Sequence, residues 1–383
     1  MSHKKRILVF TDWFLPGFRA GGPIRSLTNM VAHLGDNYEF CFVTSDRDLF
    51  SDTPYQSIKT GEWIKLSDGT PVIYLSPSQQ NEGMIKKIIL EMQADILYLN
   101  SMFSRNFTIL PLRVRNKYMP ARKVILAPRG MLGAGALKIK APKKKAFLLF
   151  SKLTRLYRNV TWHASSALEE AEIKKVMGKS ANVHIALNLS PNYPFTFITR
   201  KKEPGSLKLV FLSRITPKKN LDGTLKLLGK LDKNEQVEFT IYGPVEDQHY
   251  WDECKTIIHR LPSNIKVHHP GALRNDEVLS ALSSHHVSIL LTFNENFGHS
   301  IVESMAAGCP VLLSDHTPWR NLSAQKAGWD VSLDSESEQL EALKAAIHMD
   351  QQTFDTWSRA SMELAKSITQ KKEVVEQNRK LFA

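Results

Sequence analysis

Two glutamates and a glycine between two apolar runs form the strongest chemical signal in this sequence. The segment 294–303 reads NENFGHSIVE and separates the runs VSILL and PVLLSD. A glycine and a proline follow it, as is typical of a helix end, so we expect a short helix over 298–307. Unpaired backbone N–H groups at the start of such a helix suit a diphosphate, and Gly298 permits its close approach. Glu303 could accept hydrogen bonds from ribose hydroxyls, and Glu295, on the preceding loop, could reach a sugar.

Two cations follow another apolar run. LKLVFLS continues into SRITPKKN, which places Arg214 and Lys219 in a strand-to-helix loop. Because the carboxyl ends of parallel strands share one edge of a sheet, we expect these cations at the same edge as Gly298. There they would neutralise the charge that develops on a departing diphosphate. Each charge alone would be an ordinary solvated side chain, and it is their combination at one edge that indicates a site.

Short apolar runs alternate with helical stretches along the chain and must position these residues. Their aliphatic and β-branched composition predicts strands buried on both faces of parallel sheets, with helical crossovers. A proline-rich, charged segment over 188–208 interrupts the alternation and is typical of a linker. We therefore expect two doubly wound, Rossmann-like α/β domains over 1–195 and 205–365, and a helix over 366–383 that packs back on the first domain. The predicted strands are 6–10, 40–44, 72–75, 95–100, 124–128, 161–165, 183–188, 207–213, 237–243, 287–291 and 310–315.

Four motifs of the second half carry a family resemblance: SRITPKKN (213–220), IYGP (241–244), PGAL (270–273) and ENFGHSIVESMAAGCPVLLSD (295–315). Together they resemble the motifs of glycosyltransferase family 4, whose members are retaining enzymes of the GT-B fold. The last motif is similar to the two-glutamate E-x7-E signature of that family. The resemblance implies two Rossmann-like domains that face each other across a cleft. It implies that the N-terminal domain binds the acceptor and that the C-terminal domain binds most of the nucleotide-sugar donor.

The resemblance also implies roles for individual residues. It implies that Arg214 and Lys219 bind the donor diphosphate, that Glu295 lies near the transferred sugar and that Glu303 holds the ribose. These implications make Glu295, Arg214 and Lys219 the expected catalytic residues. Backbone atoms near Leu273 would face the nucleobase. The complete set implied to bind the donor is Gly21, Gly22, Arg214, Lys219, Leu273, Gly298, His299 and Glu303.

The first half contributes a glycine pair and one departure from the family pattern. Gly21 and Gly22 precede an amphipathic helix, as a second phosphate-approaching loop would require, although such a pair by itself indicates only a turn. After the run VILAP, Arg129 stands where many family members have a histidine. This departure argues against a histidine-assisted mechanism. It makes Arg129 a candidate for contact with an anionic or differently oriented acceptor, with an ordinary loop arginine as the alternative.

The bulk composition limits the choice of partners and cofactors. Lys and Arg number 51 against 38 Asp and Glu, and the net charge of +13 favours a polyanionic partner such as phosphate, nucleic acid or an anionic membrane. Three scattered cysteines without CxxC spacing, and histidines without ligand spacing, predict neither disulfides nor a metal. No apolar run reaches the ~18 residues of a membrane span. We therefore expect a cytoplasmic enzyme that needs no metal and no cofactor besides its donor.

A basic segment raises the question of membrane contact. Residues 138–158 read KIKAPKKKAFLLFSKLTRLYR, with apolar positions at helical spacing from Lys143 onward. Such a helix can lie on anionic headgroups, which would place the protein peripherally on the cytoplasmic face of the inner membrane. The alternative is a helix whose apolar face joins the domain core.

These observations predict a retaining glycosyltransferase that moves a hexose from a UDP- or GDP-linked donor to a glycan or lipid-linked acceptor. The expected setting is bacterial cell-surface polysaccharide biosynthesis, including capsule, O-antigen or lipopolysaccharide. Retention requires either a covalent sugar intermediate or attack on the face that the diphosphate leaves, and the resemblance favours the latter. One alternative is a sugar-nucleotide epimerase of the same fold. Another is a basic nucleic-acid-binding protein, against which stands the lack of a nucleic-acid-binding motif.

Overall fold

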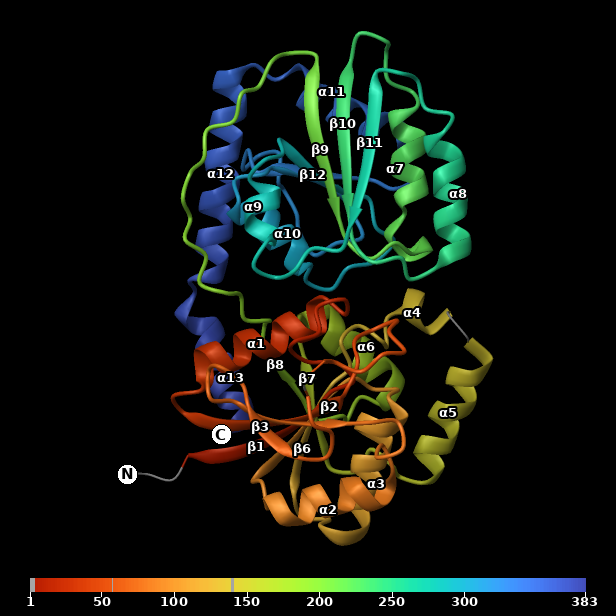
Figure 1. Cartoon of the computed structure of the whole chain (residues 1–383), viewed down its shortest axis with the longest axis vertical. Helices are drawn as coiled ribbons and strands as arrows, with labels where there is room; N and C mark the ends of the chain where they lie inside the picture. Colours follow the sequence, from red (N-terminus) through yellow and green to blue (C-terminus); the bar gives the residue numbers. More distant parts are fainter. Residues whose placement is uncertain (1–3, 57, 139–140) are drawn as a thin grey trace. The chain divides into compact units, whose positions relative to one another are not determined.

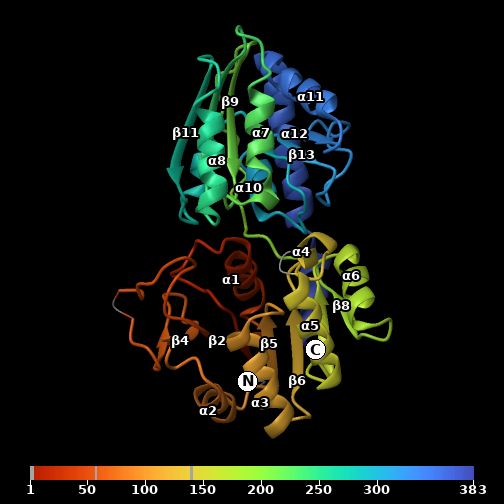
Figure 2. The same cartoon turned by 90° about the vertical axis from the view of Figure 1, so that its right-hand side faces the viewer.

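The computed structural model describes residues 4–56, 58–138 and 141–383, and the chain divides into two compact units. Unit 1 comprises Met1–Pro191 and Lys372–Ala383, and unit 2 comprises Asn192–Lys371. Each unit contains one β-sheet with helices packed on both of its faces (Figures 1 and 2). The predicted fold class, two parallel-sheet α/β domains, is confirmed.

The sheet of unit 1 has the strand order β3-β4-β2-β1-β5-β6-β7-β8. Neighbouring strands are parallel except for β3, which is antiparallel to β4. The central strands are buried along most of their length, which explains their nearly continuous apolar sequences. The strands are β1 (Lys5–Phe10), β2 (Tyr38–Ser45), β3 (Trp63–Lys65), β4 (Pro71–Leu75), β5 (Ile96–Asn100), β6 (Lys123–Ala127), β7 (Val160–Ala164) and β8 (Val183–Ile185).

Two apolar cores hold the helices of unit 1 to its sheet. Leu27 of α1 and Phe382 of α13 belong to the core on one face. Ile88 of α2, Val114 of α3 and Ile173 of α6 belong to the core on the other face. The helices are α1 (Gly22–Leu34), α2 (Glu82–Met92), α3 (Leu110–Tyr118), α4 (Ala134–Lys138), α5 (Ala141–Leu153), α6 (Ala167–Met177) and α13 (Lys372–Phe382), and a π-helical segment (Arg105–Ile109) precedes α3.

The sheet of unit 2 is parallel throughout, in the order β11-β10-β9-β12-β13-β14. Its strands are β9 (Ser206–Leu212), β10 (Gln236–Tyr242), β11 (Ile265–Gly271), β12 (Val287–Leu290), β13 (Val311–Ser314) and β14 (Gly328–Val331). Its helices are α7 (Leu221–Leu228), α8 (Gln248–Ile258), α9 (Val278–Leu282), α10 (His299–Ala306), α11 (Glu336–His348) and α12 (Gln351–Thr369), and a 3₁₀ turn (Pro217–Lys219) precedes α7.

The sequence analysis did not predict three of the strands: β3, β11 and β14. Each lies at the edge of a sheet, where one side of the strand has no neighbour. The exposure of β11 alternates along IKVHHPG, so its sequence lacks the continuous apolar run of a central strand. The expectation of a wholly parallel first sheet was wrong at β3, whose three residues pair antiparallel with β4.

The last two helices belong to different units. Helix α12 lies in unit 2, and α13 lies in unit 1. The Phe382 ring of α13 is 5.4 Å from the ring of Tyr38, and Asn378 Nδ2 donates a hydrogen bond of 2.8 Å to the carbonyl oxygen of Leu187. The C-terminal part of the predicted helix over 366–383 thus packs on the sheet of unit 1, while its first residues continue α12.

Candidate functional site

The loops that follow the strands of unit 2 meet at one edge of its sheet. Because all its strands are parallel, their carboxyl ends share this edge. The Phe293 N–H donates to the carbonyl oxygen of Lys218 at 3.0 Å, and the Glu295 N–H donates to that of His316 at 3.1 Å. These bonds fix the loops after β9, β12 and β13 to one another.

Lys219 and Glu295 form a short ion pair at this edge. The Nζ atom of Lys219 lies 2.6 Å from Oε2 of Glu295. Lys219 is buried, and the Glu295 side chain is 21% exposed. Burial raises the pKa of the Glu295 carboxyl, but the adjacent Lys219 ammonium lowers it, and the net pKa lies below its ordinary value. Glu295 is therefore ionised at neutral pH.

Gly298 begins α10 beside this ion pair. Its φ of 76° lies in the left-handed region that favours glycine. A Cβ atom there would lie 2.5 Å from Cδ1 of Ile301 and 3.1 Å from Cγ of Glu295. The first turn of a helix presents N–H groups without helical partners and the positive end of the dipole, which together favour an anion. The fold thus brings Lys219, Glu295 and the start of α10 into one site.

His299 and Glu303 lie on the same face of α10, because they are four positions apart. The His299 ring is 5.0 Å from the ring of Phe297. Glu303 is buried, one turn inside the helix that Gly298 begins. The donor-binding role of both residues stays a prediction.

Arg214 follows the same strand as Lys219 but has a different partner. Its Nη1 atom lies 2.6 Å from Oε2 of Glu246, which follows β10. The two side chains are 39% and 33% exposed. Adjacent backbone joins these loops, since the Ile215 N–H donates to the carbonyl oxygen of Pro244 at 2.9 Å. Arg214 thus lies at the same sheet edge as Lys219, in a separate ion pair.

Glu246 is a residue that the sequence reasoning missed. The available signal was an acidic residue just beyond YGP, at the end of the strand that neighbours the one before Arg214. Gly243 allows the two loops to approach, because a Cβ there would lie 1.8 Å from the carbonyl oxygen of Ser213. The ion pair between Arg214 and Glu246 depends on this close approach.

Leu273 lies beyond the end of the edge strand β11. It is partly buried and packs against a small apolar cluster that includes Val278, Leu282 and Cys309. Its side chain is therefore structural. The predicted contact with a nucleobase concerned backbone atoms near this position, and that contact stays a prediction.

The glycine pair predicted for donor binding lies in unit 1. Gly21 caps α1 with a φ of 63°, and Gly22 is the first residue of that helix. A Cβ atom added to Gly21 would meet no heavy atom within 4 Å. The positive φ therefore explains why a glycine occupies position 21, whereas close packing does not.

Arg129 belongs to a hydrogen-bonded network of unit 1. Its Nε donates to Oδ1 of Asn100 at 2.7 Å, its Nη1 to Oδ1 of Asn188 at 2.6 Å, and its Nη2 to the Tyr98 hydroxyl at 3.0 Å. His163 bonds the same hydroxyl, and burial followed by the Arg129 charge lowers the pKa of His163 to about 3. These three hydrogen-bond partners of Arg129 are neutral, and they hold the guanidinium in place.

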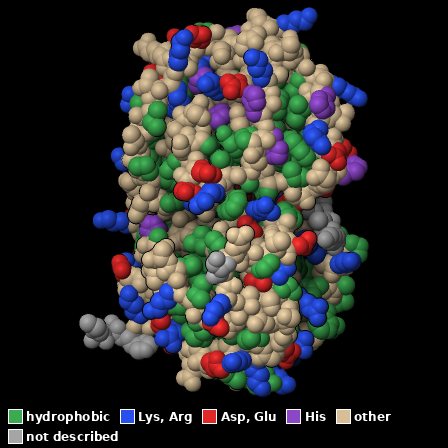
Figure 3. Space-filling view, viewed as in Figure 1, with side chains coloured by type: hydrophobic (Ala, Val, Ile, Leu, Met, Phe, Trp, Pro, Cys, Tyr) green, Lys and Arg blue, Asp and Glu red, His purple; other side chains and the backbone are tan. Residues whose placement is uncertain are grey.

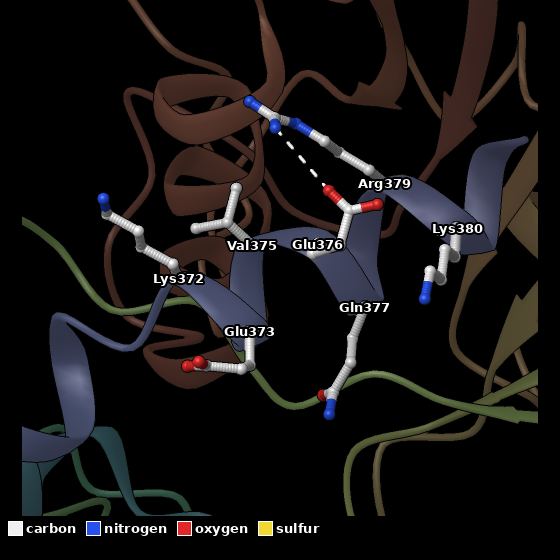
Figure 4. A pocket seen from close by; sticks show the side chains of 7 residues that line it. All are labelled: Lys372, Glu373, Val375, Glu376, Gln377, Arg379 and Lys380. Atoms are coloured by element: carbon white, nitrogen blue, oxygen red, sulfur yellow. Dashed lines mark ion pairs between the residues drawn. The ribbon is translucent and has the colours of Figure 1, made fainter.

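A surface hollow of about 640 Å³ lies along α13 (Figure 4). Every residue that lines it comes from α13, and Arg379 forms an ion pair of 3.6 Å with Glu376 there. None of the predicted site residues lines this hollow. It is therefore not part of the candidate site.

A metal site would require several ligating side chains close together. The described part of the chain contains no group of three or more His, Cys, Asp or Glu side chains that could hold a metal ion. The expectation that donor binding needs no metal stays a prediction.

The part of the chain that carries this site is similar to a known protein family. Residues 195–359 match the model of the family described as Glycosyl transferases group 1. The matched residues contain every predicted site residue of unit 2. No curated protein matches the chain in sequence.

Solved structures share the fold of this chain over nearly its whole length. HepE of Anabaena, solved with UDP and glucose, is 15% identical, with 98% of each chain covered and a TM-score of 0.70. Sucrose-phosphate synthase of Thermosynechococcus elongatus is 13% identical, with 99% of this chain and 98% of that chain covered and a TM-score of 0.74. WaaG, a glycosyltransferase involved in lipopolysaccharide biosynthesis, is 13% identical, with 98% of each chain covered and a TM-score of 0.64. At these identities the similarity establishes the GT-B fold alone.

Proposed function

We propose that this protein transfers a hexose from a UDP-sugar whose diphosphate binds at the strand-end edge of unit 2. The observation that carries the proposal is the ion pair between Lys219 and Glu295 beside the first turn of α10. A buried ammonium and a helix N-terminus both favour a diphosphate. UDP is preferred over GDP because HepE, which has the same fold, was solved with UDP-glucose.

Each charged residue has a separate task in the proposed reaction. Lys219 and the start of α10 stabilise the diphosphate as the bond to the sugar breaks. Arg214 exchanges its Glu246 partner for a phosphate oxygen. Glu295 fixes the Lys219 ammonium and accepts hydrogen bonds from sugar hydroxyls. Glu303 holds the ribose.

The proposed stereochemical course is retention through attack on the face that the diphosphate leaves. The leaving phosphate oxygen accepts the proton of the acceptor hydroxyl, so no enzyme carboxylate acts as nucleophile. Analysis of the anomeric configuration of the product by NMR tests this course. An inverted product would exclude it.

The proposed acceptor is a glycan or a lipid-linked glycan of a bacterial cell surface. WaaG, a protein of lipopolysaccharide biosynthesis, shares the fold. Arg129 stays an acceptor-side candidate because its charge has only neutral hydrogen-bond partners.

We further propose that α5 docks the protein on the cytoplasmic face of the inner membrane. Phe147 and Leu148 pack against the core of unit 1. Leu149, Phe150 and Leu153 are instead 62%, 58% and 76% exposed. These exposed apolar side chains occur among lysines, a combination that suits an anionic lipid surface. Residues 139–140 of the predicted segment 138–158 lie outside the described part, and within that part every helix is too short or too polar to cross a bilayer.

Two alternative functions have less support. On the face drawn in Figure 3, Lys and Arg are interspersed with Asp and Glu and form no continuous basic stripe, which weighs against nucleic-acid binding. A sugar-nucleotide epimerase would use the same donor site. Donor conversion to an epimer in the absence of acceptor would identify it.

Thermal denaturation with UDP, GDP or ADP tests the donor site. We expect UDP to raise the melting temperature of the wild type, and Arg214→Ala and Glu303→Ala to abolish the shift. Lys230→Ala is the matched control, because Lys230 forms an exposed ion pair with Glu336. If no nucleoside diphosphate stabilises the wild type, the proposed donor site is wrong.

A further inference from the structure

The loop that follows β13 carries a tryptophan that contacts the backbone at the start of α10. The indole Nε1 of Trp319 donates a hydrogen bond of 2.8 Å to the carbonyl oxygen of Phe297. Phe297 directly precedes Gly298, which begins α10. Trp319 is partly buried, and the sequence analysis did not connect it with the donor site. The hydrogen bond therefore joins a side chain outside the predicted site to the backbone of that site.

This bond to Phe297 also fixes the direction of the next backbone N–H group. The carbonyl of Phe297 and the N–H of Gly298 belong to one planar trans peptide, in which the two groups point in opposite directions. Because the carbonyl points toward the indole, the Gly298 N–H points away from it. That N–H has no hydrogen-bond partner within the ranges that the structure describes. An oxygen of a bound diphosphate would supply the acceptor.

Aromatic contacts support the same arrangement. The Phe297 ring lies 6.1 Å from the ring of Trp319 and 5.0 Å from that of His299, the first residue of α10. Centroid separations of roughly 4.5–7 Å are typical of favourable aromatic pairs. Trp319 thus contacts both the backbone and the ring of Phe297.

The loop that carries Trp319 is itself held in place. The Arg320 guanidinium donates through Nη1 to the carbonyl oxygen of Trp319 at 2.7 Å and through Nη2 to that of Asp315 at 2.6 Å. The carboxyl group of Asp330, in β14, accepts a bond of 3.0 Å from the Asn321 N–H. The indole therefore projects from backbone that its neighbours fix.

Two further hydrogen bonds join this loop to the segment before Gly298. His316 Nδ1 hydrogen-bonds the carbonyl oxygen of Phe293 at 3.0 Å, and the carbonyl oxygen of His316 accepts the bond from the Glu295 N–H. Neither of these bonds involves Trp319. Loss of the indole N–H should therefore release the peptide between Phe297 and Gly298 while the two loops stay together.

We infer that Trp319 is a positioning residue of the donor site, whose indole N–H holds the Phe297–Gly298 peptide so that the Gly298 N–H faces the diphosphate. The inference rests on the proposed function, because the diphosphate is the group that this N–H binds. Lys219 acts on the diphosphate through its own charge. Trp319 acts on it through the backbone and does not touch it.

Calorimetric titration of the full chain with UDP and with uridine tests the inference. Trp319→Phe keeps an aromatic ring and removes the N–H. We expect the affinity for UDP to fall ~10-fold, because a hydrogen bond to a charged phosphate is lost. The affinity for uridine, which has no phosphate, should stay the same. Replacement of Trp319 by benzothienylalanine, in which sulfur takes the place of the indole N–H, should reproduce this loss with a ring of nearly the same size.

Trp357→Phe is the matched control. Trp357 is a partly buried residue of α12 whose ring stacks on that of Trp329 at 4.6 Å, and its substitution should leave the affinity for UDP unchanged. Equal affinity of the wild type and both Trp319 variants for UDP would overturn the inference. A parallel loss of UDP and uridine binding, with a lower melting temperature, would also overturn it, because Trp319 would then support the whole unit.

Binding of pyrophosphate separates failure of this inference from failure of the proposed function. Pyrophosphate has the two phosphates of UDP without the nucleoside, and we expect the Trp319 variants to bind it ~10-fold more weakly than the wild type. A wild type that binds neither UDP nor pyrophosphate overturns the donor site, and the role of Trp319 with it. A wild type that binds UDP no better than its Trp319 variants do overturns the role of Trp319 alone. If the wild type binds only pyrophosphate, the choice of UDP is wrong, and the variants decide the role of Trp319 by their affinity for pyrophosphate.

Discussion

The strand-end loops of unit 1 and unit 2 differ in how they balance charge. In unit 2, Lys219 pairs with Glu295 and Arg214 pairs with Glu246, so each cation has a carboxylate partner. In unit 1, Arg129 donates hydrogen bonds to neutral oxygens of Asn100, Asn188 and Tyr98. A cavity of the same unit, lined by Asp12, Trp13 and Phe50 among others, carries carboxyl groups and aromatic rings.

This difference shows that one architecture can carry two different sets of side chains at the same edge of its sheet. Both sheets are built from parallel βαβ units and present their loops at the carboxyl edge. The side chains on the loops then decide the chemistry, as the general independence of fold and function leads one to expect. Paired cations and a helix start suit a diphosphate.

The largest expected effect comes from Lys219→Ala. The substitution removes a buried cation from the diphosphate site and leaves Glu295 without its partner. We expect kcat/KM to fall by ~10³-fold, and the UDP-induced thermal shift to disappear. Steady-state kinetics and thermal denaturation measure both effects. Lys226→Ala, which breaks an exposed ion pair with Asp222, is the control and should change neither.

Arg214→Ala should have the next largest effect. We expect kcat/KM to fall by ~10²-fold, because one cation at the leaving diphosphate is lost while Lys219 remains. The melting temperature of the free protein should hardly change, since the ion pair with Glu246 is partly exposed. A large loss of stability without a loss of activity would show that Arg214 is structural, and the contrast between the two edges would fail.

The apolar side chains on α5 provide a third test, confined to unit 1. The triple variant Leu149→Ser, Phe150→Ser, Leu153→Ser should reduce flotation with anionic vesicles by ~10-fold. Leu168→Ser is the control, because Leu168 of α6 is 59% exposed. If the wild type floats with neither anionic nor neutral vesicles, the membrane proposal is wrong.

The smallest expected effect is the dependence of stability on Glu295 and pH. The folded-state pKa of Glu295 lies below its ordinary value, so the charged carboxylate stabilises the fold above its unfolded pKa of about 4.3. Glu295→Gln should cost about 2 kcal/mol at neutral pH. The difference from wild type should shrink as pH falls through the folded-state pKa. Urea denaturation at several pH values measures it, and a difference that grows in acid would contradict the assignment.

The second half of the chain was more predictable than the first. The motif NENFGHSIVE and the loop SRITPKKN predicted that Gly298, Lys219 and Glu295 lie at one sheet edge. This was possible because strand-to-helix loops of parallel sheets have strong local signals. The local signal for Glu246 was weaker, an acidic residue just beyond YGP, and the cavity of unit 1 had no local signal. Trp13 and Phe50 are far apart in sequence and meet only through the pairing of β1 with β2.

The sequence by itself determined the two α/β units, their buried strands and the helix that starts at Gly298. It did so because the periodicity of apolar residues and the positions of glycine are local properties. Only the tertiary structure decided which charges pair, that Arg129 has neutral partners, and which face of α5 stays exposed. Those outcomes depend on contacts between residues distant in the chain, and local sequence patterns do not specify such contacts.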